Sequence, residues 1–111
     1  MKINVRQRDG VTILETKGKI TIGVGDVALR EAVHRELEAG NKSILIDMSG
    51  VTTIDSSGIG ELVSTYTSVK NRGGKLKLLS LPAKVSDILQ ITQLISVFET
   101  YDDEGEAVAS F

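Results

Sequence analysis

One short apolar run near the middle of the chain restricts the possible folds more than any other feature. Residues 43–48 read Ser-Ile-Leu-Ile-Asp-Met, a nearly unbroken series of large apolar side chains. A strand with one wet face would alternate apolar and polar residues, whereas a continuous short run is typical of a strand that is covered on both faces. The run therefore predicts a central strand with other elements packed over it.

The segments on either side of this run alternate between strand and helix patterns. Residues 3–5 and 11–13 alternate in polarity around Asp9-Gly10, which predicts a hairpin. Apolar spacing and turn residues then predict, in chain order, a helix from Asp26 to Leu37 that stops at Gly40, a helix from Ile59 to Val69, a strand over 76–81, a helix starting at Pro82, a strand over 97–101 and a short helix over 104–111. We therefore expect a single α/β domain over residues 1–111, with a mixed central sheet of about four to five strands and about four helices packed against it.

Composition excludes several classes of function. The chain has 111 residues, a formal net charge of -2, no cysteine and one histidine, His34. A phosphate backbone attracts clustered Lys and Arg, so direct nucleic-acid binding is not expected. Zinc and redox cofactors lack ligands. No stretch approaches the roughly 18 apolar residues of a membrane span, and residues 1–5 lack a signal-peptide pattern, so we expect a cytoplasmic protein without membrane insertion.

The segment Asp55-Ser56-Ser57-Gly58 lies between the central strand and the following helix. The first N–H groups of a helix have no partner within the helix, and Asp and Ser are residue types that cap them. Gly58 and Gly60 allow a partner or the neighbouring strand to approach the backbone closely. Ile59 is either a surface anchor for a partner or a core residue, and its helical spacing with Leu62 and Val63 favours the core.

The same segment resembles a known family. An aspartate, two hydroxyl residues and Gly-Ile-Gly at 55–60 follow a strand that ends in Asp and a Val-Thr-Thr-Ile segment at 51–54. This pattern resembles the signature of STAS-domain anti-sigma factor antagonists. The opening hairpin, the helix over 29–37, the Asn-Arg-Gly-Gly turn at 71–74 and the late Leu-rich strand occur in the order of that family over nearly the whole chain.

The resemblance implies partner switching, without an enzymatic activity of the chain itself. In this family the first hydroxyl residue after the aspartate, here Ser56, is phosphorylated by an anti-sigma factor that is a serine kinase, and a serine phosphatase reverses the modification. The unmodified protein sequesters the kinase and frees the sigma factor. The resemblance places partner contacts at Asp55, Ser57, Gly58, Ile59 and Thr21.

One position departs from the family pattern. Many antagonists follow their second strand with Gly-Glu-Leu-Asp, and this chain has Gly18-Lys19-Ile20-Thr21, so Thr21 stands where an acidic residue near the phosphorylatable serine is expected. That acid is implicated in docking the kinase. The substitution leaves open a scaffold role in a stress-signalling complex, a kinase with altered contacts, or an accessory role in lipid transport.

Two enzyme-like alternatives come from other motifs. Residues 23–28 fit G-x-G-x-x-A, a dinucleotide-binding pattern beginning with Gly23-Val24-Gly25, and Asp47 follows about 20 residues later. The chain has length for only half of such a fold. A serine hydrolase is less favoured still, because Ser57 lacks the glycine two residues earlier that a nucleophile elbow requires. No catalytic site and no cofactor is expected.

Overall fold

The structure is a computed structural model that describes residues 1–111, and its five strands form one sheet in the order β1-β2-β3-β4-β5. Strands β1 and β2 pair antiparallel, and the other neighbours pair parallel. The elements are β1 Lys2–Arg8, β2 Val11–Ile20, α1 Gly25–Glu38, β3 Ser43–Ile54, α2 Ser56–Asn71, β4 Lys75–Leu79, α3 Ala83–Ile91, the 3-10 turn η1 Leu94–Ser96, β5 Thr100–Tyr101 and α4 Glu104–Ala109. The predicted α/β class, mixed sheet and four helices are confirmed.

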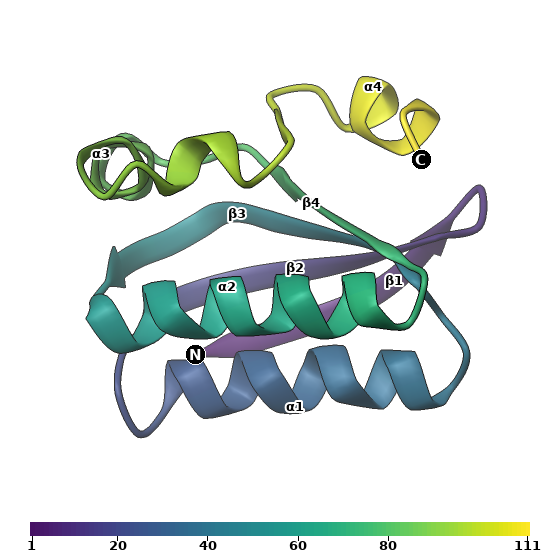
Figure 1. Ribbon diagram of the computed structural model, residues 1–111, viewed down its shortest axis with the longest axis horizontal. Coiled ribbons are helices and arrows are strands. Elements are labelled where there is room, and N and C mark those ends of the chain that lie inside the picture. The colour runs from purple at the N-terminus through teal and green to yellow at the C-terminus, as the bar shows by residue number, and fades with distance from the viewer.

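Alternate residues of the strands supply two separate apolar clusters. The larger has 19 buried residues and takes the residues of β3 at 44, 46 and 48 together with side chains from α1, α2 and α3. Helices α1 and α2 lie side by side in Figure 1, each with one apolar stripe turned inward. We call this side of the sheet the main face.

The opposite side, here called the minor face, has a cluster of only six buried residues. Leu45 of β3 lies in it, between strand residues and Ala107 and Val108 of α4. Figure 1 shows α4 beyond β4, apart from α1 and α2. The Glu104 carboxylate pairs with Arg6 and Arg8 of β1, which ties α4 to the opening hairpin. The prediction of an inward-facing terminal helix is confirmed.

Two strands differ in length from their predictions. Strand β3 continues through residues 49–54, beyond the apolar run at 43–48 that predicted a strand. These residues pair with the second half of β2, and register shifts in β2 at Glu15/Lys17 and Gly18/Lys19 absorb the mismatch. Strand β5 has only two residues, because Phe98 leaves the predicted strand to pack into the main cluster.

The parallel connections determine where the loops lie. In the units β2-α1-β3 and β3-α2-β4 each helix starts at the carboxyl end of a strand, and Ile20 of β2 pairs with Ile54 of β3. The loops before α1 and α2 therefore emerge at one edge of the sheet, where ligands and partners commonly bind in parallel sheets. No helix has the length and apolar content needed to cross a membrane.

Candidate functional site: the loops before helices α1 and α2

Asp55 joins the two loops at this edge. Its Oδ1 accepts a hydrogen bond from the backbone N–H of Gly58 at 2.9 Å, which makes it the N-cap of α2. Its Oδ2 accepts from the backbone N–H of Ile22 at 3.0 Å, in the loop before α1. The hydrogen bond from Gly58, and then that from Ile22, lower the pKa of Asp55 below its usual value, because they stabilise the carboxylate. One side chain thus caps a helix and fixes the neighbouring loop.

Two glycines seat the starts of both helices against the end of β2. A Cβ on Gly58 would lie 2.1 Å from the carbonyl oxygen of Ile20, and one on Gly25 would lie 2.0 Å from that of Lys19. Neither distance is compatible with a side chain, so both positions require glycine for close backbone approach. The expectation of a close approach is confirmed for Gly58, where the approaching group is the neighbouring strand. Nothing lies within 4 Å of a Cβ built on Gly60.

Ser56 is the first residue of α2, and its side chain is exposed. Its hydroxyl makes no hydrogen bond to another protein atom, whereas the neighbouring Asp55 is committed to two. Ser57 is half-buried. A group added to the Ser56 hydroxyl would point to solvent next to the first N–H groups of a helix. Such a position tolerates an anion, because the helix dipole is positive there.

Ile59 and Thr21 lie in different environments. Ile59 is only 7% exposed and belongs to the main cluster, so of the two readings of this residue the structure has the core one. Thr21 is half-buried beside the Asp55 loop, and its carbonyl oxygen accepts hydrogen bonds from Val24 N at 3.4 Å and Asp26 N at 3.3 Å. Thr21 thus shapes the turn that leads into α1.

Sequence reasoning missed two apolar residues at this site. Ile22 is 72% exposed and Val24 is 61% exposed, on either side of Gly23 in the loop that Asp55 holds. Large apolar side chains exposed together beside polar residues mark interaction surfaces. Strand β2 ends at Ile20, so these residues cannot be explained as part of a strand. No local signal distinguished them, because Ile20, Ile22 and Val24 continue the alternation that is typical of a strand.

The dinucleotide alternative does not fit this geometry. Asp47 lies in the body of β3, opposite Glu15 of β2, and its Oδ1 accepts from the N–H of Ser49 at 3.0 Å. The start of α1 lies instead beyond the carboxyl ends of β2 and β3, where Ile54 pairs with Ile20. The acidic residue of a dinucleotide site has to reach the ribose next to the glycine loop. No group of three or more His, Cys, Asp or Glu side chains is arranged to hold a metal ion.

Comparisons with known proteins agree with this architecture. The model of the STAS domain family matches residues 2–107. A Thermotoga neapolitana protein assigned as an anti-sigma factor antagonist is 36% identical over 100 residues, which cover 90% of this chain and 88% of that protein. The crystal structure of a Thermotoga maritima protein with the same assignment has a TM-score of 0.89 at 28% identity, over 97% of this chain and 92% of that one. The Bacillus cell fate determinant SpoIIAA in its phosphorylated form has a TM-score of 0.75 at 15% identity, over 98% of both chains.

Proposed function

The chain belongs to the STAS domain family, and from that premise we propose that it is an anti-sigma factor antagonist whose binding edge is controlled at Ser56. The observation that carries the proposal is the exposed, uncommitted Ser56 hydroxyl beside the exposed apolar pair Ile22 and Val24, on a loop held by Asp55. The partner is an anti-sigma factor with serine kinase activity, and a serine phosphatase restores the free hydroxyl. The protein acts in the cytoplasm and has no catalytic role of its own.

The physical basis of such a switch is the contrast between solvent and an interface. Phosphorylation of Ser56 adds a charge of about -1.5 to -2 and three acceptor oxygens. In the free protein this group is solvated at the start of α2, so the fold persists. In a complex that covers Ile22 and Val24, the same dianion loses its hydration and lies next to the Asp55 carboxylate. Uncompensated burial of charge is strongly unfavourable, so the modified protein releases its partner.

Asp55 and Thr21 set the shape of the binding edge in this proposal. Asp55 acts chiefly through its two backbone hydrogen bonds, which fix the exposed loop of Ile22 relative to Ser56. Thr21 stands where many relatives carry an acid, so the partner kinase meets one negative charge fewer at this position. We infer that recognition here depends more on the apolar pair than on an acidic contact.

The proposal is tested with the serine kinases encoded by the host of this protein. The purified chain is incubated with each kinase and ATP, and phosphate is located by mass spectrometry. We expect phosphate on Ser56, and a loss of kinase binding by calorimetry of at least about 100-fold after modification, which corresponds to a few kcal/mol. The control variant is Ser64→Ala, which changes an exposed serine within α2. It should leave phosphorylation and kinase binding as they are in the unaltered protein. Phosphate on Ser57 or Thr21 alone, or unchanged binding after Ser56 is phosphorylated, contradicts the proposal.

A further inference from the structure

The outer edge of β4 is open over half of its length. Strand β4 has five residues, but β5 has only two, and they pair with Leu78 and Leu79. No strand lies beside residues 75–77 on that side. An unpaired strand edge presents backbone donors and acceptors that can pair with another chain.

Hydrogen bonds on either side of Leu76 show which way its backbone groups point. The N–H of Lys75 donates to Lys42 O at 2.9 Å, towards β3, and the N–H of Leu78 donates to Glu99 O at 3.0 Å, towards β5. Because the direction alternates along a strand, the N–H and C=O of Leu76 point to the β5 side. No backbone hydrogen bond joins Leu76 to the residues that precede β5. A donor and an acceptor therefore lie side by side on this edge. Leu76 as a whole is only 4% exposed, so a partner reaches these groups only where Leu76 lines the groove described next.

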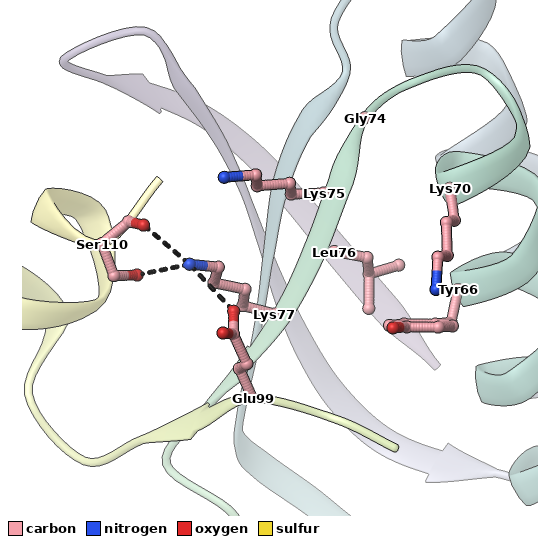
Figure 2. Close-up of a pocket in the computed structure, with 8 residues that line it drawn as sticks. All are labelled: Tyr66, Lys70, Gly74, Lys75, Leu76, Lys77, Glu99 and Ser110. Atoms are coloured by element: carbon pink, nitrogen blue, oxygen red, sulfur yellow. Dashed lines mark hydrogen bonds and ion pairs between the residues drawn. The ribbon is translucent and has the colours of Figure 1, made fainter.

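A groove of about 420 Å³ runs along this edge. Figure 2 shows β4 at its centre, with Lys75 and Lys77 directed to the side of Ser110, and Tyr66 and Lys70 on the side of α2. Glu99 closes the end towards β5. The groove thus straddles the edge of the sheet from α2 to the end of α4.

The three lysines of the groove differ in the hydrogen bonds and ion pairs that their ammonium groups make. The Lys77 Nζ lies 2.8 Å from Ser110 O, 2.9 Å from Ser110 Oγ and 2.9 Å from a Glu99 carboxylate oxygen, and its side chain is buried. Lys70 and Lys75 are exposed, and neither has a carboxylate within ion-pair distance. Two free positive charges therefore flank the open edge, in a chain whose formal net charge is -2.

We propose that the open edge of β4 binds an extended acidic segment of a partner protein as an added strand, in line with β5. The N–H and C=O of Leu76 pair with the backbone of that segment, and Lys70 and Lys75 receive its carboxylates. A small anion accepts hydrogen bonds but cannot supply a donor for the C=O of Leu76, whereas a peptide backbone satisfies both groups. The same lysines repel the β4 edge of a second copy, which favours an acidic partner over self-association.

The groove beside β4 is separate from the surface at the carboxyl ends of β2 and β3, which carries Ser56. Lys70 lies near the C-terminal end of α2 and Ser56 at its start, so about 21 Å of helix separates them. Both surfaces can therefore be occupied in one complex. A peptide result at β4 leaves the proposed function untouched, and Ser56→Asp serves as a variant that is expected to bind the peptide as the unaltered protein does.

The first test is amide hydrogen exchange by NMR on the full chain. In the free protein we expect Leu76 to exchange at least about tenfold faster than Leu78, which donates to Glu99 O. The probe is a capped peptide, Glu-Val-Glu-Val-Glu, at millimolar concentration. It should slow the exchange of Leu76 and shift the amide signals of residues 75–77. Equal exchange of Leu76 and Leu78 in the free protein, or no response of residues 75–77 to the probe, overturns the proposal.

The second test separates strand addition from simple charge attraction. The same peptide with the amides of its central glutamate and of the preceding valine N-methylated keeps its charge but loses strand pairing, and it should bind at least about fivefold more weakly. Lys75→Glu should weaken binding of the unmodified peptide by about fivefold or more. Lys84→Glu changes an exposed lysine of α3 outside the groove and should leave affinity unchanged. Equal affinity of the N-methylated peptide, or equal losses in the two lysine variants, identifies charge attraction alone and overturns the proposal.

Discussion

The two faces of the sheet are built on different principles. The main face buries a 19-residue apolar cluster under α1, α2 and α3, whereas the minor face has six buried residues under α4 and a set of ion pairs around them. The main face holds the helices whose starts form the proposed binding edge. The minor face holds one short helix through Glu104 and Lys77. The dense apolar packing therefore lies on the face that carries the proposed binding edge, and polar contacts hold the helix on the face where the buried apolar cluster is small.

The largest effects are expected from truncating neighbouring core side chains that point to opposite faces of the sheet. Ile46 and Leu45 are adjacent in β3 and both are fully buried, in the main and minor clusters respectively. We expect Ile46→Ala to lower the free energy of unfolding by about 4 kcal/mol, and Leu45→Ala by about 2 kcal/mol, because the short α4 can move into the space. Urea unfolding at constant m-value measures both. Equal losses would show that the minor face is packed as rigidly as the main one.

Two glycine substitutions test how closely the start of α2 packs against the end of β2 on the main face. Gly58→Ala places a Cβ 2.1 Å from the backbone of Ile20, so α2 must shift, and we expect a loss of about 2 kcal/mol. Gly60→Ala meets no atom within 4 Å and lies inside the same helix, so we expect a gain of about 0.5–1 kcal/mol. Thermal unfolding of the two variants gives shifts of opposite sign. A stabilising Gly58→Ala would contradict the observed seat.

On the minor face, Lys77→Met removes the charge but keeps most of the aliphatic stem. Its hydrogen bonds to Ser110 disappear, while Glu99 is exposed enough to be solvated alone, so we expect a loss of only about 1 kcal/mol. Amide exchange in α4 should accelerate, and exchange in α1 and α2 should not. Lys75→Met is the matched control, because Lys75 is exposed on the same strand. A global acceleration of exchange would mean that α4 is part of the main cooperative unit.

Acid pH probes one carboxylate on each side and has the smallest expected effect. Hydrogen bonds from Gly58 and Ile22 lower the pKa of Asp55, and hydrogen bonds from Arg6 and Arg8 lower that of Glu104. A lowered pKa in the folded state means that each group stabilises the fold above its ordinary pKa of about 4, and that this contribution is lost as pH falls through the lowered value. We therefore expect the melting temperature of Asp55→Asn and of Glu104→Gln to fall less steeply below pH 4 than that of the unaltered protein. Parallel curves for all three proteins would show that neither carboxylate contributes to the loss of stability at acid pH.

Local patterns in the sequence predicted the elements whose burial is set by their own residues. The continuous run at 43–48 and the helical spacing of Leu29 and Leu62 found a central strand and two helices, because each side chain contributes directly to the core. The second half of β3, residues 49–54, was not predicted as strand, because its pairing depends on register shifts in β2, 30 or more residues away along the chain. No local pattern reports such a partner.

At the candidate site, the two hydrogen bonds of Asp55 differ in the same way, because one is local in the sequence and the other joins distant residues. The capping bond from Gly58 to Asp55 spans three residues, so the local sequence at 55–58 was sufficient to predict a cap. Its second bond, to the N–H of Ile22, spans 33 residues and depends on how two strands end together. The exposure of Ile22 follows from that long-range contact, and for this reason the apolar part of the binding edge could not be predicted.

The close approach of three backbone segments at Ile20 affects how fast and how long a partner binds. The N–H of Asp55 donates to Ile20 O at 3.4 Å, and Gly25 and Gly58 both pack against the backbone there. A surface held in this way is already ordered before binding, so little conformational entropy is lost on association. Association is then limited by diffusion and orientation, at about 10⁵–10⁷ M⁻¹s⁻¹ for ordinary protein pairs. A chemical change at this edge would be read mainly in the lifetime of the complex.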